Sequence, residues 1–180
     1  MLFRSPVFRF LHALQGCNKP VVAAVCGPAV GIGTTMLLHC DYVVAAPNAV
    51  FSTPFVRLGL CSEGAASTLL PLVVGMRVAQ AMLMWGKSLD AQAALLHGLV
   101  TDVVEVGQAH AVALARANEI ASLPSASVTA VKSLMRLDGH EVRKVMAEEA
   151  QEFSRLLAGD AAKEAFTAFL EKRMPNFAGL

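Results

Sequence analysis

A glycine-rich segment near the start of the chain has the residue types and spacing of a backbone binding site. Gly27, Gly31 and Gly33 form a G-x-x-x-G-x-G pattern shortly after the apolar run VVAA. A strand, a glycine-rich turn and a helix together form a cradle for an anion, because the first N–H groups of a helix have no partners inside it. The segment therefore predicts a site for a pyrophosphate or for a developing oxyanion.

The pyrophosphate alternative would make the chain a nucleotide-binding module. The same glycine pattern occurs in short-chain dehydrogenases, which also carry a tyrosine followed four residues later by a lysine. Here the only tyrosine, Tyr42, has Ala46 at that position, and the acidic residue that usually ends the second strand is absent. A test for NAD binding separates this alternative from the oxyanion site.

The ionisable side chains form no second reaction centre that the sequence reveals. By its spacing alone, Glu63 is an acid in the first turn of a helix, where the helix dipole stabilises it. The consecutive His39, Cys40 and Asp41 make no triad, because sequence neighbours point in different directions, and Asp41 is assigned a structural role. The remaining histidines lack metal-ligand spacing, so no metal site is expected. Solvated positions are expected for Arg77, Lys87 and Lys132.

Composition favours a folded chain with a small-molecule partner. The 180 residues are 55% hydrophobic and 16% charged, which argues against disorder. A net charge of +1, with one Trp and one Tyr, argues against a nucleic-acid partner. The uncharged run 21–38 contains a proline and three glycines, so strand, turn and helix are predicted there rather than a membrane span. Four scattered cysteines without a C-x-x-C pair indicate a reducing compartment, and a cytoplasmic location is predicted.

Periodicity and turn residues predict strands early in the chain and helices late. Strands are expected at 21–26, 42–46, 49–55 and 99–105, the first of them buried. Helices are expected at 5–16, 33–40, 63–75, 76–86 and 88–98, with further helices beginning near 107, 124, 140 and 160. The helices at 63–75, 76–86 and 88–98 each end at a glycine suited to a left-handed conformation. A unit of a strand followed by a helix recurs.

The chain from KPVVAAV through FSTPFVRLGLCSEGAAS to GKSLDAQAALLHGLVTDVV resembles the crotonase (enoyl-CoA hydratase/isomerase) superfamily. The resemblance implies an α/β fold of the ClpP/crotonase type, a spiral of strand–helix units. It implies a truncated crotonase core at 1–105, with the family's N-terminal portion missing, and a helical region at 106–180 that forms trimers. The implied partners are an acyl-CoA thioester substrate and further copies of the chain, as a homotrimer or hexamer. No separate cofactor is implied, because coenzyme A is part of the substrate.

The same resemblance assigns residues to the substrate. In the family, two backbone N–H donors hold the thioester oxygen, and the donor on the glycine loop corresponds to Ile32, with Gly31 and Gly33 permitting close approach. The second donor belongs to a segment upstream of this chain. Four further residues are implied to contact substrate, two at the acyl group and two at coenzyme A, often of a neighbouring subunit: Phe55, Leu58, Phe169 and Lys172.

The carboxylates point to one reaction of the family. Its hydratases carry two glutamates, at positions that correspond to Thr35 and Phe55, whereas Glu63 corresponds to the single catalytic glutamate of peroxisomal-type Δ3,Δ2-enoyl-CoA isomerases. One carboxylate suffices for isomerisation, because it can move a proton from C2 to C4 of the same dienolate. The resemblance thus implies isomerisation of 3-enoyl-CoA to 2-enoyl-CoA in fatty acid oxidation. A hydratase or other crotonase-type acyl-CoA enzyme, and a catalytically silent truncated subunit, are the alternatives.

Overall fold

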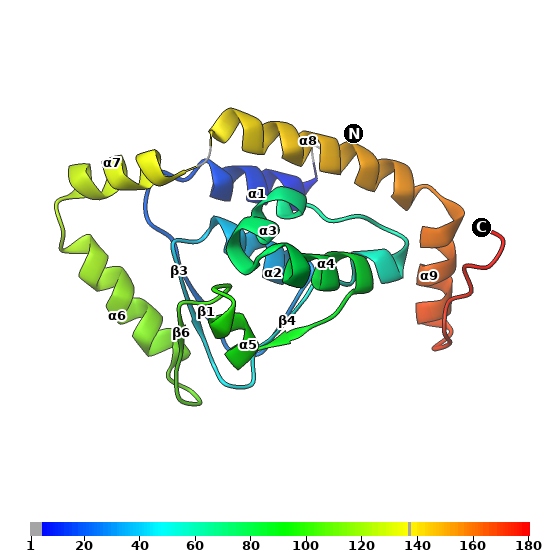
Figure 1. Cartoon of the computed structure of the whole chain (residues 1–180), viewed down its shortest axis with the longest axis horizontal. Helices are drawn as coiled ribbons and strands as arrows, with labels where there is room; N and C mark the ends of the chain where they lie inside the picture. Colours follow the sequence, from blue (N-terminus) through cyan, green and yellow to red (C-terminus); the bar gives the residue numbers. More distant parts are fainter. Residues whose placement is uncertain (1–4, 137) are drawn as a thin grey trace.

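The computed structural model describes residues 5–136 and 138–180, and its strands form two small sheets (Figure 1). The strands are β1 (Val22–Val25), β2 (Pro28–Val30), β3 (Tyr42–Ala45), β4 (Val50–Ser52), β5 (Leu89–Asp90) and β6 (Asp102–Val103). One sheet has the order β1-β3-β6 and is parallel throughout. The other has the order β2-β4-β5, in which β2 and β4 are parallel and β5 is antiparallel.

Helices make up most of the remaining chain. They are α1 (Pro6–Gln15), α2 (Ile32–Thr35), the 3-10 helices η2 (Met36–His39) and η3 (Pro54–Leu58), α3 (Ala66–Val74), α4 (Met76–Trp85), α5 (Ala91–Leu96), α6 (Ala109–Ala121), α7 (Ser125–Met135), α8 (Gly139–Leu157) and α9 (Asp160–Leu170). In Figure 1, α1 and α8 lie together along one side, while α6 with α7 and α9 lie at opposite ends. Within residues 5–136 and 138–180, no helix combines the length and apolar character needed to cross a bilayer.

The predicted recurrence of a strand–helix unit is confirmed, and the first unit has one more strand than predicted. β1 leads into β2 and then α2, and β3 leads into β4 and then η3. β1 pairs with β3 and β2 pairs with β4, both in parallel, so successive units stack on one another. The chain therefore winds as an α/β spiral that contributes one strand of each unit to each sheet.

The core lies on both faces of β3, because helices cover both faces of this parallel sheet. Successive side chains of a strand point to opposite faces. Val43 accordingly belongs to the main core with Phe51 of β4, Leu70 of α3 and Met82 of α4. Val44 points the other way and packs on α6. The spiral and the helices around it thus form the rigid support of the glycine loop.

Two predictions about strands need correction. The strand predicted as buried at 21–26 is β1, which lies at the edge of its sheet and is only half-buried. The turn predicted between this strand and the next helix contains β2, which begins at Pro28. Proline is tolerated at the first residue of a strand, where its missing N–H breaks no ladder. Because glycine followed by proline is typical of a turn, the sequence predicted a turn here instead of this three-residue strand.

The helix predicted at 63–75 also differs in the structure. It begins at Ala66, because Gly64 and Ala65 both adopt positive φ and stop the helix from extending back to Glu63. At the other end, Gly75 has φ 80 and ψ 152, which lies outside the left-handed helical region predicted for it. Glu63 is therefore a turn residue that precedes α3, and not a residue of its first turn.

Candidate active site

The glycine loop is tied to the second sheet and presents the unpaired backbone N–H of Ile32. Gly31 adopts φ 58 and ψ −118, a conformation that favours glycine, and its N–H donates to the Ser52 carbonyl at 2.9 Å. The Thr34 hydroxyl accepts a hydrogen bond from Ser52 N–H at 3.1 Å. Among the described residues, none accepts a hydrogen bond from the N–H of Ile32. The loop thus holds this N–H in place at the start of α2, available to an incoming oxygen.

Two of the predicted substrate residues lie at or next to this loop. A Cβ on Gly31 would lie 3.7 Å from the Phe55 ring, so the buried Phe55 packs directly against the loop. Leu58 belongs to the same apolar cluster as Phe55. A Cβ on Gly33 would meet only Ala29 at an ordinary 3.7 Å. The role of Gly33 in close approach to a ligand therefore stays a prediction.

Glu63 is a buried carboxylate held by one hydroxyl. Its side chain is 3% exposed, and the Thr35 hydroxyl of α2 donates a hydrogen bond to Oε1. Its Oε2 has no hydrogen-bond partner among the described residues. Burial raises the pKa of Glu63, the nearby Glu149 raises it further, and the Thr35 hydroxyl partly opposes this. A carboxyl with a raised pKa and an uncommitted oxygen is suited to accepting and returning a proton.

A second buried carboxylate, Glu149 of α8, holds the start of α3. Its Oε2 accepts from Ala65 N–H at 2.6 Å, and its Oε1 accepts from Ser67 N–H at 2.9 Å and from the Ser62 hydroxyl at 3.3 Å. The carboxylate therefore satisfies helix N–H groups that have no partner within α3. Glu149 is thus engaged on both oxygens, unlike Glu63.

Glu149 was missed from the sequence, although α8 carries a signal for it. An acid 84 residues from its partner gives no local motif. However, Val142, Met146 and Ala150 are the buried apolar residues of α8, and Glu149 occurs on the same face. A charged residue on the apolar face of a helix is almost never buried without a partner, so this position was open to prediction.

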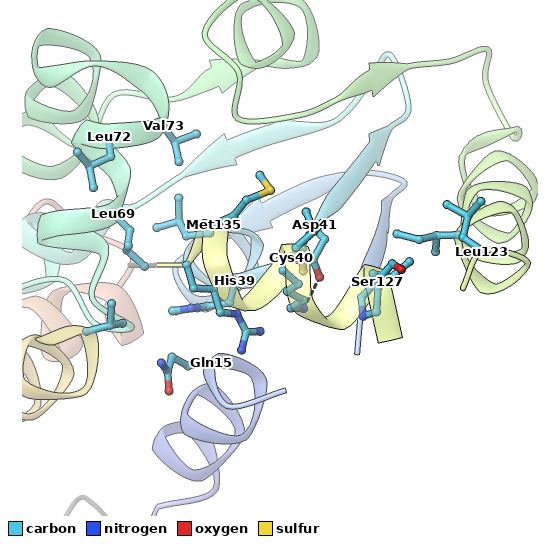
Figure 2. A pocket seen from close by; sticks show the side chains of 18 of the residues that line it. Gln15, His39, Cys40, Asp41, Leu69, Leu72, Val73, Leu123, Ser127 and Met135 are labelled. Atoms are coloured by element: carbon cyan, nitrogen blue, oxygen red, sulfur yellow. Dashed lines mark hydrogen bonds and ion pairs between the residues drawn. The ribbon is translucent and has the colours of Figure 1, made fainter. Parts of the chain in front are cut away.

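His39 connects the turn after Glu63 to a cavity of about 840 Å³. His39 Nε2 lies 2.8 Å from the carbonyl oxygen of Gly64, so this nitrogen carries the proton and donates it. Figure 2 shows His39 and Gln15 in the cavity wall, together with apolar residues of α3 and α7. Neither Glu63 nor Ile32 lines this cavity. The cavity therefore does not include these two candidate residues, and His39 contacts both the cavity and the turn after Glu63.

The prediction that Lys132 is solvated is wrong. Lys132 is 8% exposed and forms an ion pair with Asp41, and it also donates to the Lys19 carbonyl at 2.7 Å. Asp41 accepts in addition from Val21 N–H at 2.7 Å, which confirms its structural role. Helical spacing on α7 could not reveal this contact, because it joins residues 91 positions apart.

Burial and the adjacent Asp41 raise the pKa of Cys40 to about 11, so this cysteine is an inert thiol.

The remaining predicted residues lie on the surface. Arg77 and Lys87 are exposed, as predicted. Phe169 is 76% exposed near the end of α9, and Lys172 is exposed just beyond that helix. Their contact with coenzyme A stays a prediction. In the ranges that the structure describes, no cluster of three His, Cys, Asp or Glu side chains is placed to hold a metal ion.

Comparisons with known proteins identify what this arrangement is similar to. The family model described as enoyl-CoA hydratase/isomerase matches residues 1–179. The 2,3-dehydroadipyl-CoA hydratase of Escherichia coli K12 is 36% identical over 167 residues, which cover 92% of this chain and 66% of that protein. Enoyl-CoA delta isomerase 2 of Rattus norvegicus is 37% identical over 161 residues, which cover 89% of this chain and 41% of that protein.

A solved structure shares the fold over most of the chain. The crystal structure of an enoyl-CoA hydratase/isomerase from Pseudoalteromonas atlantica T6c superposes with a TM-score of 0.92 at 46% identity. The match covers 95% of this chain and 69% of that one. The chain thus spans about two thirds of the length of the proteins it matches, or less.

Proposed function

Because the chain belongs to the enoyl-CoA hydratase/isomerase family, whose members are enzymes, we propose that its site isomerises a 3-enoyl-CoA to the conjugated 2-enoyl-CoA. One observation carries the proposal. Glu63 is a buried carboxylate with one uncommitted oxygen, held by Thr35 on the same short helix that begins with Ile32. The substrate is an acyl-CoA thioester, with coenzyme A as part of the substrate rather than as a cofactor.

Glu63 moves the proton in this proposal. Its carboxylate takes the proton from C2, and the electron pair of the broken C–H bond moves into the thioester to form a dienolate. The protonated Glu63 then delivers the same proton to C4, and the double bond forms between C2 and C3. The raised pKa supports this role, because a carboxylate closer in pKa to its carbon acid transfers a proton more readily in both directions.

The N–H of Ile32 stabilises the dienolate oxygen. It is fixed by the loop conformation at Gly31 and has no acceptor among the described residues. A donor placed in advance contributes most where charge develops in the transition state, and one such donor is worth roughly 3 to 4 kcal/mol. Gly33 belongs to this loop and Phe55 packs against it, so the acyl group would lie beside these two residues.

Hydration is disfavoured by the residues at the other two positions. Adding water needs groups to deprotonate the water and to protonate carbon. Thr35 and Phe55 have no carboxylate, and Glu149 has both oxygens occupied by hydrogen bonds. At the positions considered, the described part of the chain therefore offers Glu63 alone as a proton-transfer carboxylate, which fits isomerisation rather than hydration.

The test compares Glu63→Gln with wild type in the native polypeptide. The variant keeps the size and the Thr35 contact but cannot accept the proton, so isomerase turnover is expected to fall at least about a hundredfold. Formation of conjugated enoyl-CoA is followed by ultraviolet absorbance. Glu152→Gln, on the exposed side of α8, is the matched control and is expected to keep full activity. Near-normal turnover by Glu63→Gln would remove Glu63 from the mechanism.

A second assay separates the two activities of the family. Wild-type enzyme is given a 3-enoyl-CoA and, separately, crotonyl-CoA with water as the other reactant. Isomerisation is expected to be far faster than hydration, because Thr35 and Phe55 stand where hydratases carry glutamates. Comparable rates on the two substrates would overturn the isomerase proposal and favour a hydratase.

A further inference from the structure

The turn that carries Glu63 has a backbone conformation that its own sequence disfavours. Ala66 N–H donates to the Glu63 carbonyl at 3.3 Å, and the two residues between them have φ 71 at Gly64 and φ 60 at Ala65. Positive φ at both central residues defines a type I′ turn, which favours Gly, Asn or Asp at both positions. Glycine followed by alanine suits a type II′ turn instead, where only the first central residue has positive φ. The turn is held in the less favourable of two forms.

The two forms differ by a flip of the peptide group between Gly64 and Ala65, and this group is held at both ends. Its carbonyl oxygen accepts from His39 Nε2 at 2.8 Å, and its N–H donates to Glu149 Oε2 at 2.6 Å. The two partners come from η2 and α8, which are separate elements. A flip would lose both hydrogen bonds and turn the carbonyl oxygen towards the Glu149 carboxylate.

We propose that His39 and Glu149 are positioning residues, which hold the Gly64–Ala65 peptide in the orientation that presents Glu63 to the substrate. The inference rests on the proposed function of Glu63. Glu63 is the first residue of the turn, so the orientation of the central peptide sets the direction in which the chain leaves Glu63. Neither His39 nor Glu149 touches the reacting atoms; both act through the turn.

The turn packs directly on the partner of Glu63, so a change in the turn reaches the carboxylate. A Cβ on Gly64 would lie 3.5 Å from the Leu11 methyl groups and 3.7 Å from Thr35 Cβ. Thr35 donates the hydrogen bond that holds Glu63. A flipped peptide would shift the turn against these neighbours and displace the carboxylate from the Thr35 hydroxyl. A displacement of about 1 Å at a reacting group can cost about a hundredfold in rate.

His39→Leu is the variant that removes one end of this support, and it is tested with its own rescue. The expected result is a kcat at least about tenfold lower, with KM changed less than about twofold, because substrate binding is untouched. Adding Ala65→Gly should restore most of the lost kcat, because glycine makes the type I′ turn favourable without the His39 bond. His39→Gln, which keeps an N–H donor at the end of its side chain, should retain most of the activity.

Two controls make the rescue specific. Ala66→Gly in the His39→Leu background should restore nothing, because Ala66 is already helical and gains no turn conformation from glycine. His110→Leu, a change at an exposed histidine of α6, should leave kcat unchanged. Equal rescue by Ala65→Gly and Ala66→Gly, or full kcat in His39→Leu, would overturn the proposal.

A measurement without substrate separates this proposal from the function of Glu63. Amide hydrogen exchange at Ala65 should be slow in wild type and at least about tenfold faster in His39→Leu, because the peptide then has one partner and flips more often. If wild type shows no isomerase activity, the function proposed for Glu63 fails while the exchange data still decide whether His39 holds the peptide. Unchanged Ala65 exchange in His39→Leu would refute the role of His39 whatever the activity.

Discussion

Removing the Glu149 carboxylate is the sharpest test of how the candidate site is supported. Glu149→Ala takes away the acceptor of two backbone N–H groups, those of Ala65 and Ser67, and of the Ser62 hydroxyl. Each N–H that is buried without an acceptor costs about 1 to 3 kcal/mol. The Ala65 N–H is buried and the Ser67 N–H is partly buried. Water can therefore reach the second more easily, and a loss of about 3 kcal/mol of unfolding free energy is expected.

The assay is urea unfolding at neutral pH, followed by circular dichroism, with two further variants beside Glu149→Ala. Glu149→Gln keeps one acceptor oxygen and should lie between wild type and Glu149→Ala. Glu152→Ala removes an exposed acid of the same helix that forms an ion pair with Arg155, so its change should stay within about 0.5 kcal/mol. A loss below about 1 kcal/mol for Glu149→Ala, or an equal loss for Glu152→Ala, would refute the reasoning from unsatisfied donors.

Three further outcomes are expected. Burial raises the pKa of Glu63 above 4.5 in the folded state, so the folded chain binds an extra proton there, and the stability that this provides is lost as pH rises from 4.5 through the folded pKa. Glu63→Gln should therefore gain unfolding free energy relative to wild type between acidic and neutral pH, and a pH-independent difference would contradict this. Isomerase kcat/KM should rise with pH as Glu63 ionises. Because the Thr35 hydroxyl lowers the pKa of Glu63, Thr35→Val should move this rise to higher pH, whereas Thr35→Ser should leave it in place. Lys132→Met should lower the unfolding free energy by roughly 1 to 3 kcal/mol, because it leaves Asp41 without its cation. Adding Asp41→Asn to the same chain should recover part of this loss. Lys87→Met, at an exposed site, should change the unfolding free energy little.

The elements of the fold were predictable where the signal is local. The helix over Pro6–Gln15 has Ser5 as its cap and proline at its first position, and both signals lie within four residues of the helix start. The recurrence of strand and helix in the first half was likewise predicted from the residues, whereas the spiral was implied by the resemblance to the crotonase superfamily. β2 was not predicted, because a three-residue strand that begins with proline is too short to show a period of two in its hydrophobic residues.

The residues of the candidate site divide in the same way. The glycine loop was singled out by its own residue pattern, and Glu63 by the resemblance of its surrounding motif to the crotonase superfamily. His39 and Glu149 act on the turn after Glu63 from 25 and 84 positions away. The apolar face of α8 indicates that Glu149 is buried, but which residues it contacts depends on which helix faces overlap in space, and no single-sequence pattern encodes that. The burial of Lys132 was missed for the same reason, since its partner is 91 positions distant.

The long separation between Glu149 and the turn it holds has a consequence for the order in which the chain acquires its catalytic geometry. During synthesis the N-terminal part is available to fold first, so the spiral, the glycine loop and Glu63 all leave the ribosome before α8 exists. The contact between Glu149 and Ala65 closes a loop of 84 residues, and the entropy cost of closing this loop is offset only by later packing. Until α8 docks, the Gly64–Ala65 peptide lacks one of its two partners and is free to take the relaxed turn. A nascent or C-terminally clipped chain would thus contain Glu63 and the glycine loop and still lack the contact from α8 that holds the turn after Glu63.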